Sequence, residues 1–357
     1  MVFQFLVTRN QKIMKSILYL LLLFPFFSSG IVSGQATSID PAKFFEDTSV
    51  LHVTIKTNII NLLRHKQKAG MKFPAEISFM LPDSTSVNEP ITIETRGHFR
   101  KDFCYVPPLK IIFKDKKKSV LEPLGSLKLV NQCMVSEVYR QYLVSEWLVY
   151  KMYNLLTDKS YRVRLLNLQI IDTTERKKPI IENAFLVERT SDLANRNNCS
   201  ELKIKRIENN MTDRQQMTLV GIFEYMIGNT DWAVSVSHNS RLLRSKNDPS
   251  SLPYPVPYDF DYSGLVNTSY AIPDPQLDIS NVRERLYRGF PRTFDEINET
   301  LDIFKNQEKN IDALITNCNL INSRTKKDLT RYLDDFFTLI KDPAAINQTF
   351  VRNARKY

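Results

Sequence analysis

The order of the secondary-structure signals constrains the fold of this chain more than any other feature of its sequence. Between residues 51 and 131, short segments rich in β-branched residues alternate with turn-forming clusters, a pattern typical of strands. These segments are "LHVTIKT", "AEISFM", "ITIET", "LKIIF" and "SLKLV". After residue 210 the pattern becomes mostly helical. Strands followed by helices in this way indicate an α+β fold whose two halves pack as lobes.

A long helix is predicted from about residue 136 to residue 156, followed by two further strands in "RVRLLNLQII" and "ENAFLVE". The apolar face of this helix includes Val149 and Tyr153 and carries Glu146 near its middle. A buried carboxylate must be paired or neutralised, so we expect a cationic partner for Glu146 inside the fold. A partly exposed position at the edge of the stripe, or a purely structural ion pair, would explain Glu146 equally well.

A second helix has readable ends in "MTDRQQMTLVGIFEYMIGN". Thr212 and Gln215 have the spacing of a capping box, which predicts the first turn. Gly228 suits the position just past the last turn. The helix would therefore lead into a loop at "NTDW", where Asp231 would be presented by a rigid support.

The first residues have the pattern of a secretory signal peptide, which we assign to residues 1–36. Arg9, Lys12 and Lys15 precede a short apolar run, and small residues follow it. Its removal would lower the formal net charge from +10 to +7, because the leader carries three positive charges. We expect an exported protein, in the periplasm, on the cell surface or secreted, without a membrane span after cleavage. An uncleaved anchor is the alternative.

The remaining composition limits the kinds of partner and metal. Basic residues are scattered apart from "KDKKKS", so we do not expect a nucleic-acid partner. No two cysteines form a CxxC pair, which argues against zinc. Export permits disulfides, and three pairings of the cysteines are possible. We favour Cys104 with Cys133, because both are flanked by strand-like segments and lie close together in the chain.

Polar residues gather in two segments of the second half. "YMIGNTDWAVSVSHNSRLL" supplies Asp231, His238 and Asn239, and "PVPYDFD" supplies Asp259 and Asp261. An Asp, a downstream Asn and a second Asp after a short β element form the divalent-metal half of a kinase-type site. Such oxygen ligands favour magnesium or manganese over zinc. The alternative for the two aspartates is a proline-bounded turn, where aspartate is favoured for local hydrogen bonds.

These segments resemble the spore-coat protein H (CotH) kinase-like family of exported proteins, and more closely a subgroup of uncharacterised exported bacterial proteins. The resemblance covers roughly residues 90 to 266, through "ETRGHFRKDFCYVPPLKIIF", "LKLVNQC", "FLVER" and "PYDFDYSGLV". It implies a two-lobed architecture like that of protein kinases. A β-rich N-terminal lobe with one long helix would span residues 37–208. A mainly helical C-terminal lobe with the metal-site loops would span residues 209–357.

The resemblance also implies roles for residues that would bind the nucleotide. Lys110 would contact its phosphates, Glu146 would orient that lysine, and Glu188 would lie near the hinge. Arg96 and Arg100 would bind phosphate or an acidic substrate. For Lys110, a solvent-facing position on the strand is the alternative, which the alternation in "LKIIF" permits.

For the reaction itself, the resemblance implies that Asp231 is the catalytic aspartate. Asn239 and Asp259 would bind the metal, with Asp261 helping or holding the turn. Two features depart from kinases: position 236, five residues after Asp231, is valine, and no GxG loop occurs.

The function expected from these features is that of an exported phosphotransferase. It would use ATP or another nucleotide with Mg²⁺ or Mn²⁺ to phosphorylate a hydroxyl of an unidentified protein or small molecule. The departures keep a catalytically inactive, kinase-like binding or envelope-structural protein as the first alternative. A metal-dependent glycosyltransferase of the Asp-x-Asp type is the second, although no doubly wound nucleotide-binding pattern is found.

Overall fold

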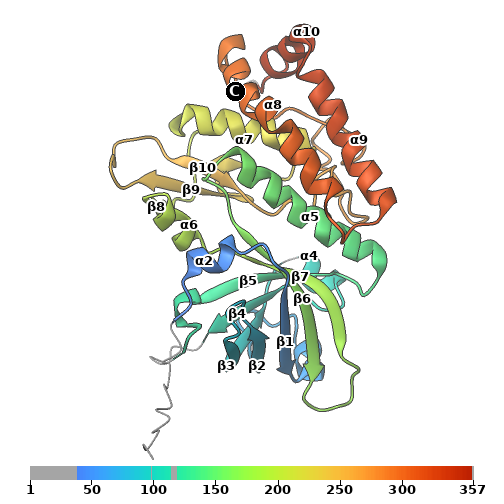
Figure 1. Ribbon diagram of the computed structural model, residues 1–357. Helices are drawn as coiled ribbons and strands as arrows, with labels where there is room; N and C mark the ends of the chain where they lie inside the picture. Colours follow the sequence, from blue (N-terminus) through green and yellow to red (C-terminus); the bar gives the residue numbers. More distant parts are fainter. Residues whose placement is uncertain (1–37, 98, 114–118, 356–357) are drawn as a thin grey trace, which may run out of the picture. The chain divides into compact units, whose positions relative to one another are not determined.

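The computed structural model describes residues 38–97, 99–113 and 119–355 as a mixed α+β structure (Figure 1). Its first part contains a closed barrel with the strand order β1-β2-β3-β4-β5-β7-β6. The strands are β1 (Leu51–Thr57), β2 (Lys72–Met80), β3 (Ser86–Thr95), β4 (Leu109–Phe113), β5 (Ser126–Asn131), β6 (Val163–Asp172) and β7 (Ile180–Val187). All neighbours pair antiparallel except β1 and β6, which are parallel. Each strand segment expected from residues 51–131 is found.

The barrel closes because alternate side chains along its strands are apolar and point to one interior. In β4, buried positions alternate with half-buried ones. Ile55, Ile93, Ile111 and Leu127 are fully buried and belong to one hydrophobic cluster. The other side of each strand is left for polar residues, and this alternation places the two lysines described below.

The predicted long helix is α5 (Glu137–Leu156), which connects β5 to β6. It begins after Ser136 and contacts β6, β7 and α8 (Phe294–Thr316). Figure 1 shows α5 in green between the barrel strands and the helices near the C-terminus. Most of α5 is buried, in a second hydrophobic cluster shared with α7 (Arg214–Ile227) and α9 (Ser323–Leu339). Side chains of α5 therefore contact the barrel strands on one side and the helical part on the other.

The helical part also holds a three-stranded antiparallel sheet in the order β10-β9-β8. Its strands are β8 (Cys199–Glu201), β9 (Ser240–Ser245) and β10 (Tyr254–Pro257). The shorter α-helices are α2 (Pro41–Glu46), α3 (Ile59–Arg64), α4 (Phe99–Phe103), α6 (Thr190–Arg196) and α10 (Pro343–Ile346). The loops after α7 and after β10 carry the three aspartates singled out in the sequence, Asp231, Asp259 and Asp261.

The two ends of α7 test the capping predictions. The predicted capping box at Thr212 is wrong, because Asp213 is the N-cap and its side chain accepts a 2.8 Å hydrogen bond from the Gln216 amide. The physical reason is that a carboxylate one residue later competes for the same amides. Gly228 is confirmed as the C-cap, with a left-handed φ of 67°. At this position an added Cβ would collide with the Tyr332 hydroxyl.

The disulfide prediction is confirmed: Cys104 and Cys133 are bridged, and Cys199 and Cys318 are free. The bridge is consistent with an oxidising, exported environment. In the described residues, no helix combines the length and the apolar character that a membrane crossing requires. The signal peptide assigned to residues 1–36 lies outside the described residues.

Candidate functional site

A cavity of ≈ 540 Å³ opens beside strands β4 and β5 and brings four of the predicted site residues together. Arg96, Lys110, Glu188 and Asp259 all line it. Lys128, which the sequence analysis did not select, lines it as well. The cavity thus combines three cationic side chains from the barrel with a carboxylate from the loop after β10.

Lys128 is the site residue that the sequence analysis missed. It pairs in register with Lys110 on the neighbouring strand, so both side chains emerge on the same face of the sheet. Its ammonium lies 4.4 Å from the centre of the Tyr258 ring. Although the Lys128 side chain reaches solvent, desolvation by the surrounding protein, reinforced by the charge of Arg96 and opposed by Asp259, lowers its pKa to about 8. The sequence signal that could have identified Lys128 is its position in the strand directly before the long helix.

Arg96 leaves the end of β3, and its Nε donates a 3.2 Å hydrogen bond to the carbonyl of Leu109. Burial lowers the pKa of its guanidinium, and the nearby charge of Asp259 is the main opposing influence. The guanidinium is therefore held in a partly dry position close to that carboxylate. A positive group fixed in this way is suited to a phosphate or carboxylate ligand.

Asp259 is held by its backbone, and its side chain faces the cavity. Its amide donates a 2.9 Å hydrogen bond to the hydroxyl of Tyr150 on α5. Its φ of 71° is left-handed, a conformation that aspartate tolerates better than most residues. No group of the described residues donates a hydrogen bond to its carboxylate. The turn interpretation explains the backbone of Asp259 and leaves its carboxylate for a ligand.

Glu146 departs from what the sequence predicted. It is 2 % exposed, so the edge-of-stripe alternative is wrong. The expected ion pair is absent from the described residues too, and Oε1 has no hydrogen-bond partner there. Burial, together with the charges of Asp261 and Asp259, raises the pKa of Glu146 well above its usual range, while Arg100 opposes this. Burial without a contact ion pair therefore favours the neutral form of this carboxyl group.

Asp261 holds the turn together. It accepts a 2.9 Å hydrogen bond from the Tyr270 hydroxyl and lies 3.6 Å from Nη1 of Arg100. Arg100 also donates a 2.7 Å hydrogen bond to the carbonyl of Asn131, which connects the turn to β5. Burial and the neighbouring Asp259 raise the pKa of Asp261 to about 6, and Arg100 opposes this. Asp261 and Arg100 line a small pocket with Glu146, which shares no lining residue with the larger cavity.

Asp231 sits in the loop after α7, with both carboxylate oxygens engaged. Oδ1 lies 2.7 Å from Nε2 of His238, and Oδ2 accepts a 2.9 Å hydrogen bond from Nδ2 of Asn239. The carboxylate is 39 % exposed and lines a different cavity of ≈ 350 Å³. In this loop, hydrogen bonds therefore hold the side chains of Asp231, His238 and Asn239 in fixed positions relative to one another.

The two aspartate loops are in contact through their backbones. The amide of Tyr258 donates a 3.0 Å hydrogen bond to the carbonyl of Asn239. The charge of Asp231 also contributes to the raised pKa of Asp261, more weakly than burial and Asp259 do. Asp231 and Asp259 therefore belong to adjoining loops but open into different cavities.

Glu188 has a structural environment at the end of β7. Its carboxylate accepts a 3.0 Å hydrogen bond from the Arg162 amide and forms an ion pair with Arg196 at 2.9 Å. It is buried and lines the rim of the larger cavity. Its contacts fix the path of the chain as it leaves the barrel.

The oxygen donors near the cavity suit magnesium better than a metal that needs a full cage of protein ligands. Among the described residues, no group of three or more His, Cys, Asp or Glu side chains is arranged to hold a metal ion. Magnesium is typically bound by one or two carboxylates together with substrate phosphates, rather than by a cage of protein ligands. The carboxylate of Asp259, beside the loop of Asn239, fits a cation shared with a phosphate ligand.

A scan against protein-family models finds no match for this chain. A search of curated proteins also finds no relative.

Proposed function

We propose that the chain is an exported, kinase-like phosphotransferase that uses a nucleotide with Mg²⁺ or Mn²⁺ to phosphorylate a protein or small-molecule hydroxyl. One observation carries the proposal: a single ≈ 540 Å³ cavity combines Arg96, Lys110 and Lys128 with the free carboxylate of Asp259. A triphosphate and its metal need this combination of several cations and a carboxylate.

The cavity also offers surface for the rest of a nucleotide. Val130, Val187 and Tyr161 line it together with the cations. Apolar and aromatic walls with a few fixed polar groups are typical of small-molecule sites. A base packed on this surface would direct its phosphates towards Lys128 and Asp259.

The architecture proposed for this function is the two-lobed one implied by the resemblance. The barrel strands would form the nucleotide-binding lobe, and α5 would correspond to the helix that carries the conserved glutamate of kinases. Two observations support this. Lys128 lies on the strand before α5, and Glu146 lies on α5 among the charges of the site. In this proposal Lys128, rather than Lys110, is the principal phosphate-binding lysine.

The metal would be held by the Asp259 carboxylate and the amide oxygen of Asn239, whose nitrogen faces Asp231. When bound, it would neutralise charge on the phosphate oxygens. Arg96 and Lys128 would stabilise the negative charge that develops during transfer, because they are fixed before the substrate arrives. Asp231, oriented by His238, would accept the proton of the attacking hydroxyl.

One observation favours the second candidate, a nucleotide-binding protein without activity. Both oxygens of Asp231 already accept or share hydrogen bonds, and the side chain opens into a cavity other than that of Asp259. In that case the nucleotide would bind while the acceptor hydroxyl would not be activated. Binding and transfer must therefore be measured separately.

Calorimetry of ATP binding, with and without Mg²⁺, tests the proposal. We expect Lys128→Met to weaken binding at least about tenfold, since a charged hydrogen bond to the phosphates is lost. Asp259→Asn should remove the dependence on Mg²⁺. Lys178→Met, an exposed lysine in the turn between β6 and β7, is the control and should bind as the wild type does.

Transfer is then followed with radiolabelled ATP and a mixture of acceptors. Asp231→Asn should abolish transfer and retain binding. Binding without transfer in the wild type would establish the inactive candidate. Absence of nucleotide binding in any condition would refute both.

A further inference from the structure

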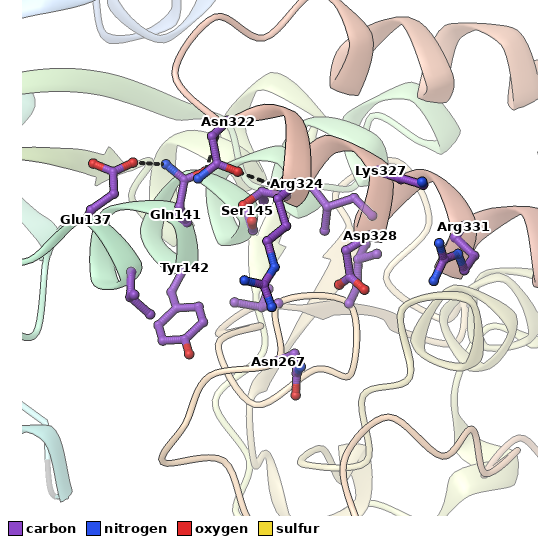
Figure 2. A pocket seen from close by; sticks show the side chains of 15 residues that line it. Glu137, Gln141, Tyr142, Ser145, Asn267, Asn322, Arg324, Lys327, Asp328 and Arg331 are labelled. Carbon is purple, nitrogen blue, oxygen red and sulfur yellow. Dashed lines mark hydrogen bonds between the residues drawn. The ribbon is translucent and has the colours of Figure 1, made fainter.

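A second large cavity, of ≈ 670 Å³, lies between the N-terminal halves of α5 and α9, beside the loop at 265–267 (Figure 2). We call it the basic groove. Figure 2 shows Arg324, Lys327 and Arg331 along one helix, with Glu137 and Tyr142 on the other side. The groove is separate from the cavity proposed for the nucleotide, and the two share no lining residue.

The charges that line this groove are unbalanced. Glu137 is neutralised by Arg140, with contacts of 2.6 and 2.8 Å. Asp328 is neutralised by Arg283, with contacts of 2.9 and 3.2 Å. Neither of these arginines lines the groove. The acids of the groove are therefore already paired from outside it.

The three cations of α9 have no such partners. Arg324, Lys327 and Arg331 are exposed, and none forms an ion pair with a carboxylate of the described residues. Their spacing of three and four residues places them on one face of the helix, over roughly 10 Å. A single small anion cannot reach all three charges. A linear ligand with several negative charges can.

The walls of the groove are fixed in place. Oε1 of Gln141 on α5 accepts a 2.9 Å hydrogen bond from the amide of Asn322, the N-cap of α9. Leu265, Val266 and Leu329 are buried beneath the groove and give it an apolar floor. A preformed surface of this kind binds with a smaller ordering cost than a mobile one.

We propose that the basic groove docks an extended, acidic segment of a partner protein. In an extended chain, side chains on the same face recur roughly every 7 Å, whereas successive cations of α9 are about 5 Å apart along the helix. The long arginine and lysine side chains span this difference, so alternate Asp or Glu residues can meet successive cations. The guanidinium groups of Arg324 and Arg331 would form paired hydrogen bonds with these carboxylates. The peptide backbone would lie over the apolar floor. This inference does not rest on the proposed phosphotransferase, since docking is measured without nucleotide.

Fluorescence anisotropy with the full chain tests it. The probe is a labelled octapeptide of alternating Glu and Ser at about 0.05 M salt, where exposed charges are weakly screened. The wild type should bind this peptide and bind the Gln–Ser counterpart much more weakly. Arg324→Glu combined with Arg331→Glu should raise Kd at least about tenfold, because attraction becomes repulsion at two contacts. The milder pair Arg324→Gln and Arg331→Gln should raise it several-fold.

The control is the pair Lys205→Glu and Lys309→Glu, which changes the net charge equally at exposed positions away from the groove. It should change Kd less than about twofold. Equal weakening by both reversed pairs would overturn the proposal, because binding would then follow net charge alone. Failure of the wild type to bind the acidic peptide would overturn it too. So would binding of single-stranded nucleic acid or anionic vesicles in preference to the peptide.

Discussion

Replacement of Glu224 by glutamine should stabilise this protein at neutral pH. Glu224 lies on α7 and is 1 % exposed, directly before the loop that carries Asp231. Its Oε2 accepts a 2.9 Å hydrogen bond from Asn229, and its Oε1 has no partner among the described residues. Burial, opposed by the Asn229 hydrogen bond and reinforced by the charge of Asp231, raises its pKa to about 8.

The size of the effect follows from this shift. The ordinary pKa of the group is 4.5, so between pH 4.5 and pH 8 the folded protein binds more protons than the unfolded chain. Stability is therefore lost as pH rises through this window. At pH 7, 2.5 pH units above the ordinary value, the loss is about 3 kcal/mol. Glutamine keeps the shape and the hydrogen bond from Asn229 but cannot ionise, so the variant should not show this loss.

Urea unfolding at pH 4.5 and at pH 7 measures the difference. Glu224→Gln should be more stable than the wild type by about 3 kcal/mol at pH 7, and nearly equal to it at pH 4.5. Glu299→Gln makes the same chemical change at an exposed position and should alter stability by less than about 0.5 kcal/mol at both values. The reasoning would be refuted by an equal gain at both pH values, or by a loss of stability at pH 7.

Three further predictions concern other parts of the fold. ATP affinity should fall as pH rises through about 8, where Lys128 loses its proton, and Lys128→Arg should remove this fall. Calorimetry at a series of pH values measures it. The same pH dependence in the wild type and the variant would show that Lys128 does not contact the phosphates. Replacement of both Cys104 and Cys133 by alanine opens a loop with a sequence separation of 29, which should cost about 3 to 4 kcal/mol in urea unfolding; a cost below about 1 kcal/mol would contradict the role of the bridge. Gly70→Ala, at a φ of 69° in open space, should lower the free energy of unfolding by about 1 kcal/mol. Gly228→Ala should lower it by about 3 kcal/mol or more, because the added Cβ also meets a tyrosine hydroxyl. Equal melting temperatures of the two variants would show that the collision is relieved.

The regular elements could be predicted from the sequence because their signals are local. Alternation along "LKIIF" and its neighbours defines the strands, and the apolar stripe defines α5. The observed N-cap of α7 lies one residue after the predicted one, because Thr212 and Asp213 both have side chains that can cap a helix. The disulfide was predicted correctly because the chain brings the ends of neighbouring segments together.

The candidate site could be predicted only in part, because tertiary contacts decide which groups meet. Lys110 and Lys128 occupy similar strand patterns, and only the closed barrel shows that both face one cavity. The burial of Glu146 could be read from its stripe, but its lack of an ion pair could not, because Arg100 comes from a distant segment. The cations of α9 resemble any solvated helix face until α5 is placed opposite them.

The central claim is that Arg96, Lys128 and Asp259 form one site for a metal and the phosphates of a nucleotide. A crystal structure with ADP and Mn²⁺, using the anomalous signal of manganese, tests it most directly. We predict a manganese peak about 2.2 Å from the Asp259 carboxylate, with the phosphates beside Lys128 and Arg96. Manganese and nucleotide bound elsewhere, with Asp259 contacting neither, would contradict the account.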